Sequence, residues 1–123
     1  MAQNPVRWFE IYVQDMNRAR KFYEPVFDVK LERLNTPDLE IWSFPIQMDR
    51  MGTSGALVKM EGFPSGNNSI IIYFACEDCA VEEARAIKQG GRIQKAKMSI
   101  GEYGYISLVY DTEGNLIGLH SMQ

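Results

Sequence analysis

The sequence is poor in the side chains from which most catalytic, redox and metal sites are built. Its 123 residues include one histidine, His120, and two cysteines, Cys76 and Cys79. A single histidine leaves no histidine pair, and no serine lies in a Gly-x-Ser-x-Gly motif. These three nitrogen and sulfur ligands also fall short of the four that a structural zinc ion requires. Zinc centres and serine triads are therefore not favoured.

Long apolar runs and a concentration of one charge are also missing. The longest uninterrupted apolar run covers residues 70–76, far short of the about 20 residues that span a bilayer. The formal net charge is −3 with acids and bases interspersed, so no basic stripe could follow a phosphate backbone. The first five residues lack the basic and apolar regions of a secretion signal. We therefore expect a cytoplasmic protein with no nucleic-acid partner and no membrane span.

The two cysteines form one Cys-x-x-Cys motif, which has two interpretations. A thioredoxin-like redox pair would open a helix inside a parallel β-α-β unit. Alternatively, Cys76 ends a strand and faces the core, while Cys79 sits in the first turn of a helix. We favour the second interpretation because free cysteine so often serves as a small buried apolar residue.

The chain divides into two halves of similar pattern, which we expect to form a single domain of two modules at about residues 1–61 and 67–123. A polar stretch rich in Gly, Pro and Asn separates them at residues 61–68. In each half a strand pattern is followed by an aspartate N-cap, an amphipathic helix and three more strands. The predicted strands are 7–13, 29–34, 39–45, 55–59, 70–76, 92–97, 104–110 and 116–121, and the predicted helices are 17–27 and about 81–89.

An internal repeat emerges when one half is slid onto the other by 63 residues. This shift places Asp15 on Asp78, Trp8 on Ile71 and Gly55 on Gly118. The order of the elements matches although residue identity is low. The pattern predicts an α+β fold in which two β-α-β-β-β modules form a curved, mostly antiparallel sheet around a cleft. A ferredoxin-like β-α-β-β-α-β domain, the alternative, would need fewer strands.

Several short motifs follow one another in a characteristic order. They are Phe-Glu-Ile-Tyr-Val-Gln-Asp at 9–15, Arg-Ala-Arg-Lys-Phe-Tyr at 18–23, Ser-Gly-Ala-Leu-Val at 54–58, Gly-Gly at 90–91 and Asp-Thr-Glu-Gly-Asn-Leu-Ile at 111–117. In this order they resemble the vicinal oxygen chelate superfamily, which includes glyoxalase I, bleomycin resistance proteins and extradiol dioxygenases. The resemblance covers essentially the whole chain. The last motif is similar to the family's Asp-Pro-Asp-Gly-Asn-x-Ile turn, with Thr112 in place of proline.

The resemblance implies a place for one divalent metal ion between the modules, with ligands from the first and last strand of each. Carried onto this chain, the ligand positions are Trp8, Gly55 or Ala56, Ile71 and Gly118. None of them offers the imidazole nitrogen or carboxylate oxygen that such a site needs. The chain thus resembles the metal-free branch, of which bleomycin resistance proteins are the familiar example. That branch implies no metal, no cofactor, a small-molecule ligand and a homodimer.

Strand alternation predicts which side chains face the cleft. On the first strand Trp8, Glu10 and Tyr12 share one face, while the apolar residues between them face a helix. In the second module the cleft face takes Ile71, Tyr73, Ala75, Leu116, Gly118 and His120, with Tyr105 near one mouth. The missing side chain at Gly118 is expected to leave room for a ligand. The predicted ligand-binding residues are therefore Trp8, Glu10, Tyr12, Tyr73, Tyr105 and His120.

The sequence leaves four functions open. The first is a metal-independent protein that binds or sequesters a small organic molecule in a cleft with few polar groups. The second is a lyase-, isomerase- or dioxygenase-type enzyme acting on a small carbonyl or hydroxylated substrate, with Glu10 as catalytic base and His120 or Tyr105 assisting. The third is a metal enzyme with Glu10 and His120 as non-standard ligands. The fourth is a small dimeric partner-binding module, and we rank small-molecule binding first.

Overall fold

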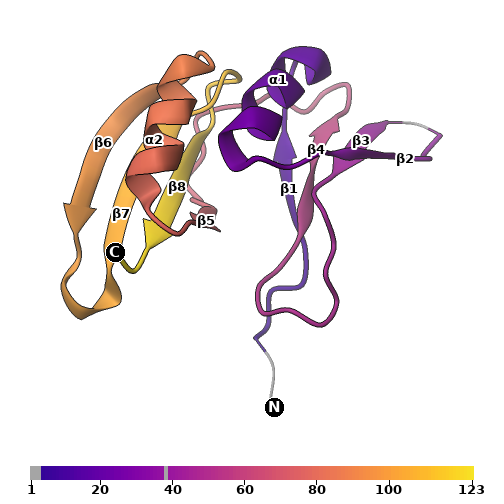
Figure 1. Ribbon diagram of the computed structural model, residues 1–123. Helices are drawn as coiled ribbons and strands as arrows, with labels where there is room; N and C mark the ends of the chain where they lie inside the picture. Colours follow the sequence, from indigo (N-terminus) through magenta and orange to yellow (C-terminus); the bar gives the residue numbers. More distant parts are fainter. Residues whose placement is uncertain (1–3, 38) are drawn as a thin grey trace.

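The computed structural model describes residues 4–37 and 39–123 as two β-α-β-β-β modules, as the sequence predicts (Figure 1). The first module contains β1 (Phe9–Tyr12), α1 (Met16–Phe27), β2 (Glu32–Leu34), β3 (Glu40–Ser43) and β4 (Gly55–Lys59). The second contains β5 (Tyr73–Ala75), α2 (Cys79–Lys88), β6 (Arg92–Ser99), the short 3-10 helix η1 (Gly101–Tyr103), β7 (Tyr105–Tyr110) and β8 (Leu116–Ser121). The first three residues of the predicted first module, and Asp38, lie outside the described residues.

Each module forms its own four-stranded sheet. The strand orders are β1-β4-β3-β2 and β5-β8-β7-β6. The pairs β1–β4 and β5–β8 are parallel, and the other four pairs are antiparallel, so the prediction of a mostly antiparallel α+β fold is confirmed. The sheet differs from the prediction in being two separate sheets, because β1 and β5 are edge strands that do not pair with each other.

Both helices begin where an aspartate side chain satisfies free backbone N–H groups. The Oδ1 atom of Asp15 accepts a hydrogen bond from the backbone nitrogen of Arg18 at 3.1 Å. The Oδ1 atom of Asp78 accepts one from Ala80 at 3.0 Å, so α2 begins two residues before the predicted start. Gly90, at φ 97°, follows α2 and ends it with a conformation that favours glycine.

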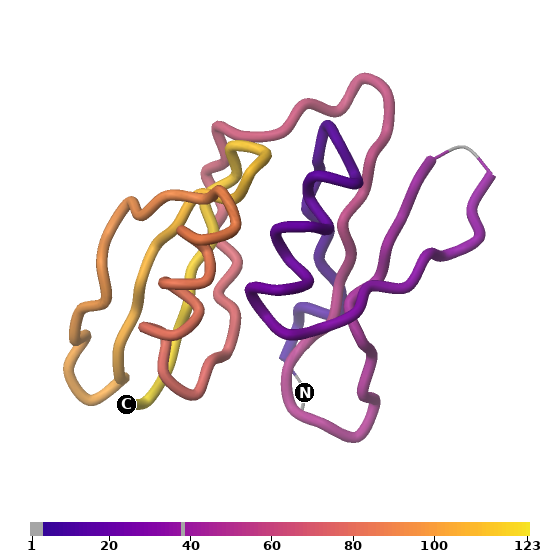
Figure 2. Tube along the Cα trace, turned by 45° about the horizontal axis from the view of Figure 1, so that its top comes forward, coloured from indigo at the N-terminus to yellow at the C-terminus, as the bar shows by residue number. Residues whose placement is uncertain are grey.

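The two helices contact each other and lie on the same side of the two sheets (Figures 1 and 2). The face of each sheet that carries apolar residues packs on its helix, and both modules contribute to one continuous core. At the module boundary, the Phe74 ring lies 4.2 Å from that of Phe27 and 6.0 Å from that of Phe9, centroid to centroid. Because the helix-covered faces share this core, the opposite faces of the two sheets point away from it.

Strand register resolves which residues are equivalent in the two modules. Glu10 is paired with Ala56 in the first sheet, and Tyr73 is paired with Gly118 in the second. The first strands are related by 63 positions, like the N-cap aspartates 15 and 78, and the pairing then relates the last strands by 62. Ala56, rather than Gly55, is the counterpart of Gly118.

Among the described residues, no helix is long and apolar enough to cross a membrane.

Candidate functional site

An exposed carboxylate stands between two aromatic side chains on the outer face of β1. The Trp8 indole Nε1–H donates to Glu10 Oε2 at 3.2 Å, and the Tyr12 hydroxyl donates to Glu10 Oε1 at 2.9 Å. The three side chains share one face because alternate strand residues point the same way, as predicted. Burial, followed by the nearby Glu10 carboxylate, raises the pKa of the Tyr12 phenol.

Phe63 completes this outer surface, although sequence reasoning missed it. Its ring stacks on Tyr12 at 5.0 Å between centroids and 21° between planes. Phe63 lies in the linker between the modules, and its carbonyl accepts a hydrogen bond from Gln14 Nε2 at 3.0 Å. The sequence signal that could have identified Phe63 is an aromatic residue in an otherwise polar linker. We call Trp8, Glu10, Tyr12 and Phe63 the Glu10 subsite.

A groove of about 930 Å³ lies between the modules. Trp8, just before β1, and Tyr73 from β5 both line it, so the structure brings together two predicted residues from different modules. The rest of the lining is largely apolar, with aromatic contributions from Phe9, Phe27, Phe44 and Phe74. Its charged lining residues are Arg7, Arg50 and Glu82.

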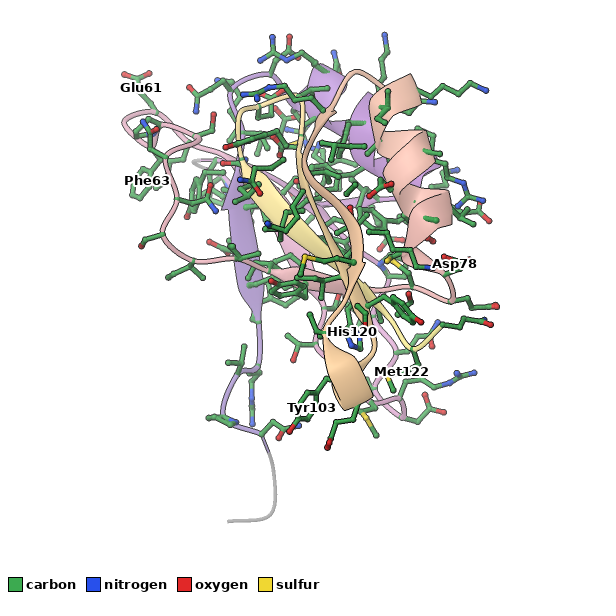
Figure 3. All side chains as sticks on the ribbon, turned by 90° about the vertical axis from the view of Figure 1, so that its left-hand side faces the viewer. Glu61, Phe63, Asp78, Tyr103, His120 and Met122 are labelled. Carbon is green, nitrogen blue, oxygen red and sulfur yellow. The ribbon has the colours of Figure 1, made fainter. Side chains whose placement is uncertain are left out.

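A second, smaller cavity of about 470 Å³ adjoins Tyr73 on the outer face of the second sheet. It is lined by Tyr73, Ala75, Ile100, Ile106 and His120. His120 Nε2 lies 2.7 Å from the backbone oxygen of Tyr103, and since a carbonyl only accepts, Nε2 carries the proton (Figure 3). In the neutral ring, Nδ1 is then left as an acceptor. Ile100 and Ile106 were not among the predicted site residues.

Gly118 has a different role from the one expected. We expected its missing side chain to leave room for a ligand, but the Tyr73 ring occupies that space. A Cβ atom added at Gly118 would overlap the Tyr73 ring. The glycine therefore lets Tyr73 lie flat against β8, where the ring forms a wall common to the groove and the smaller cavity.

Tyr105 lies on the helix-covered face of the second sheet, whereas Tyr73 and His120 lie on its outer face. Ile106 is paired with His120 on the outer face, so the adjacent Tyr105 points toward the helix-covered face. There it packs against the core, and the Lys97 ammonium lies 4.8 Å from its ring centroid. We placed Tyr105 near the cleft mouth from the sequence, and the strand register corrects this placement.

The residues at the family's metal positions do not fit a divalent ion. Trp8, Ala56, Ile71 and Gly118 supply no imidazole or carboxylate. Over residues 4–37 and 39–123, no three His, Cys, Asp or Glu side chains converge on a point that could hold a metal ion. Glu10 and His120, the non-standard pair considered from the sequence, lie on separate sheets.

The Cys-x-x-Cys motif adopts the structural arrangement rather than the redox one. Cys79 is buried in the first turn of α2, and Cys76 is half-buried directly after β5; both thiols are free. Burial and the neighbouring Glu82 carboxylate raise the pKa of the Cys76 thiol to about 12. Such a thiol is a poor nucleophile because little thiolate forms at neutral pH.

Comparison with known proteins identifies the family. Residues 6–119 match the profile of the Glyoxalase/Bleomycin resistance protein/Dioxygenase superfamily. A search of curated proteins found no match. The antibiotic binding protein TnmS3 from Streptomyces sp. CB03234 is 23% identical, with a TM-score of 0.73 over 100% of this chain and 99% of that one. The glyoxylase/bleomycin resistance protein/dioxygenase domain from Frankia sp. EAN1pec is 16% identical, with a TM-score of 0.74 over 99% and 100%.

A third similar structure is a mutant of glyoxalase I from Zea mays, at 20% identity and a TM-score of 0.75. This alignment covers 95% of the present chain but 46% of the maize chain. At these identities the structures establish the fold alone, whereas the family profile spans nearly all of the sequence. The chain therefore belongs to the glyoxalase/bleomycin resistance protein/dioxygenase superfamily.

Proposed function

We propose that the protein binds a small aromatic molecule carrying a positive charge, with Tyr73 as the central contact. The single observation that carries the proposal is that Tyr73 walls both the inter-module groove and the smaller cavity. A ligand seated on this ring would reach Trp8 on one side and His120 on the other. Largely apolar walls with a few polar groups are typical of small-molecule sites.

The Glu10 subsite supports a preference for a cation. Among the described residues, no Lys, Arg or His forms an ion pair with Glu10. Its carboxylate is flanked by Trp8 and Tyr12, and a cation there would gain both charge attraction and contact with aromatic faces. Trp8 belongs to this subsite and also lines the groove, so the two regions are continuous. We therefore expect the aromatic body in the groove and the charged group at Glu10.

Binding is favoured over catalysis by the state of the polar groups. Both oxygens of Glu10 already accept hydrogen bonds from side chains of the same strand. These two bonds hold the carboxylate in one orientation, with its negative charge exposed. His120, the other candidate acid or base, lies on the other sheet, with Nε2 committed to Tyr103. This arrangement suits an anchor that recognises charge.

Titration with two aromatic probes of opposite charge tests this proposal. Proflavine is a planar aromatic cation, and 8-anilinonaphthalene-1-sulfonate is an aromatic anion. We expect Tyr73→Ala to weaken proflavine binding about tenfold through loss of aromatic contact. Glu10→Gln should weaken it about fivefold without weakening binding of the anion. Tyr103→Ala is the matched control, because Tyr103 is exposed and lines neither cavity. Equal affinity of the wild type for both probes, or an unchanged Tyr73→Ala variant, would contradict the proposal.

We further propose a homodimer that covers the outer sheet faces. In one chain these faces point away from the shared core, so a second copy could bring a first-module face opposite a second-module face. Their charges are complementary: Glu32 lies on the first, and Arg92 and Lys95 lie on the second. Light scattering should give twice the 14.1 kDa mass of one chain. A monomer at micromolar concentration would contradict the dimer while leaving ligand binding open.

A cytoplasmic location stays a prediction.

A further inference from the structure

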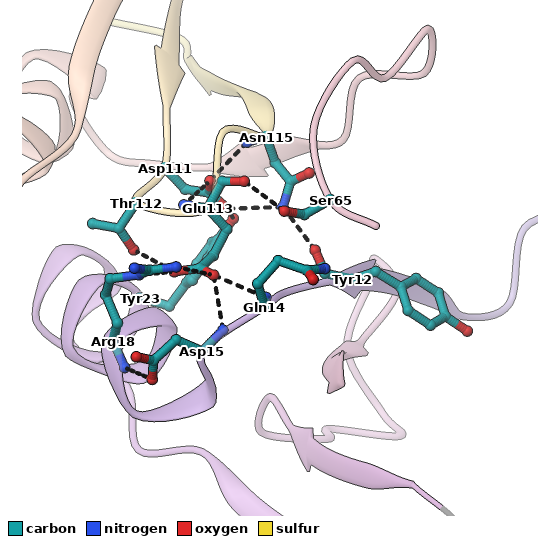
Figure 4. A network of polar contacts seen from close by, with 10 residues as sticks. All are labelled: Tyr12, Gln14, Asp15, Arg18, Tyr23, Ser65, Asp111, Thr112, Glu113 and Asn115. Carbon is teal, nitrogen blue, oxygen red and sulfur yellow. Dashed lines mark hydrogen bonds and ion pairs between the residues drawn. The ribbon is translucent and has the colours of Figure 1, made fainter. Parts of the chain in front are cut away.

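The closing turn of the second module reaches across to the ligand-facing strand of the first. This turn, residues 111–115, joins β7 to β8 (Figure 4). The side-chain amide Nδ2 of Asn115 donates to the backbone oxygen of Tyr12 at 3.0 Å, although the two residues are 103 positions apart. Tyr12 is the residue whose hydroxyl holds Glu10 Oε1. The turn thus contacts the Glu10 subsite through the backbone of Tyr12 and not through its side chain.

Asn115 is held firmly enough to act as a fixed point. Its side chain is buried, and its backbone nitrogen donates to Asp111 Oδ1 at 2.8 Å. Its Nδ2 also donates to Asp111 Oδ2 at 3.1 Å. Asp111 is in turn held by the buried Tyr23 hydroxyl, which donates to Oδ2 at 2.7 Å. These bonds fix the orientation of the Asn115 amide, so its second N–H is directed at the Tyr12 carbonyl.

The other end of the same amide holds the linker that presents Phe63. Asn115 Oδ1 accepts a hydrogen bond from the Gly66 backbone nitrogen at 2.7 Å. One residue earlier, the Ser65 hydroxyl donates to the Glu113 backbone oxygen at 2.7 Å. One amide therefore bridges the strand bearing Tyr12 and the linker bearing Phe63. This bridge sets the spacing at which the Tyr12 and Phe63 rings stack.

We propose that Asn115 is a positioning residue for ligand binding, which fixes Tyr12 and Phe63 around Glu10 without touching the ligand. The inference rests on the proposed function, because positioning matters only if the Glu10 subsite binds a charged group. Glu113 assists by accepting hydrogen bonds from the backbone nitrogens of Gln14 at 2.9 Å and Asp15 at 3.0 Å. The chain that follows Glu10 is therefore held at residues 12, 14 and 15.

Asn115→Ala and Asn68→Ala form a matched pair for the test. Asn68 is the same residue type and also ties the linker to the hairpin, through Leu116, but it does not contact Tyr12. Two readouts are needed. The first is the ratio of the proflavine and 8-anilinonaphthalene-1-sulfonate dissociation constants. The second needs no ligand: the pH titration of the Tyr12 phenol followed by carbon NMR, with Tyr12→Phe assigning the signal. Asn115→Ser is the milder variant if Asn115→Ala does not fold.

We expect Asn115→Ala to reduce the preference for proflavine about threefold, as expected from loss of one buried hydrogen bond. The pKa of the Tyr12 phenol should also fall toward its ordinary value. Without the Asn115 contact the phenol would be less buried and would lose its hydrogen bond to Glu10, and both of these raise its pKa. Asn68→Ala should change neither. If Asn115→Ala only lowers stability and both readouts match the wild type, or if Asn68→Ala shifts them equally, the inference is overturned. If the wild type shows no preference for proflavine while the Tyr12 titration still moves in Asn115→Ala alone, positioning stands and the proposed function fails.

Discussion

The guanidinium of Arg18 donates two hydrogen bonds to the carboxylate of Glu113, from Nε at 2.6 Å and from Nη2 at 2.9 Å. Glu113 has no exposed side-chain surface, whereas the Arg18 side chain is 51% exposed. Arg18 belongs to α1 of the first module and Glu113 to the closing turn of the second. The pair therefore stabilises the contact between the two modules, next to the strand that carries Glu10.

Replacing Glu113 by glutamine should lower the free energy of unfolding by about 2 kcal/mol, since hydrogen bonds to a charged group are lost in a buried place. The amide keeps one acceptor oxygen but places an NH2 group where Arg18 or a backbone nitrogen now donates. Urea denaturation measures the effect. Glu102→Gln, at an exposed position in η1, serves as the control and should lie within about 0.5 kcal/mol of the wild type. A Glu113→Gln variant as stable as the control would show that the pair contributes nothing.

The same pair predicts a pH dependence of stability. Burial works against the charged form, but hydrogen bonds from Arg18, Gln14 and Asp15 hold the pKa of Glu113 below its usual 4.5. A carboxyl with a lowered folded-state pKa stabilises the protein above its unfolded value, and this contribution is lost as pH falls through the folded value. The stability difference between wild type and Glu113→Gln should thus be full at pH 7 and shrink below about pH 4.5. A difference that stays constant down to pH 3 would contradict this assignment.

A methyl group at Gly118 should impair binding more than stability. In Gly118→Ala the new Cβ would overlap the Tyr73 ring, which must swing away from β8 and lose its place between the two cavities. We expect proflavine affinity to fall about tenfold, as for Tyr73→Ala, with a stability loss of about 1–2 kcal/mol. Ala56→Gly changes the equivalent position of the first module and should leave proflavine affinity unchanged. Unaltered binding by Gly118→Ala would show that the position of Tyr73 does not matter.

Cys76 should react slowly with thiol reagents. With a pKa of about 12, roughly one thiol in ten thousand is ionised at pH 8. Iodoacetamide labelling of the native protein followed by mass spectrometry gives the rate, with the denatured protein as the reference. Glu82→Gln should accelerate labelling, because removing the carboxylate removes one of the causes that raise the pKa. Rapid labelling of the wild type would reopen the redox interpretation of the Cys-x-x-Cys motif.

Local patterns sufficed to predict the elements of this fold. Alternation placed Trp8, Glu10 and Tyr12 on one face, and the aspartates at 15 and 78 marked the helix starts, because these signals depend on neighbours in the chain. Phe63 and Tyr105 could not be placed that way. Phe63 joins the site through the path of the linker, and Tyr105 is turned away by the strand register after η1. The close approach of Tyr73 to Gly118 depends on the pairing of β5 with β8, which no local pattern contains.

The indole N–H groups of Trp8 and Trp42 allow the most direct measurement of ligand binding. Trp8 Nε1 donates to Glu10 in the proposed site, and Trp42 Nε1 donates in the same manner to Glu40, with the Arg20 guanidinium over its ring. Proton–nitrogen NMR spectra recorded during a proflavine titration would follow both signals, with Trp42→Phe assigning them. We expect the Trp8 signal to move in a saturable way while the Trp42 signal stays in place. A stationary Trp8 signal, or equal movement of both, would contradict binding at the Tyr73 groove and the Glu10 subsite.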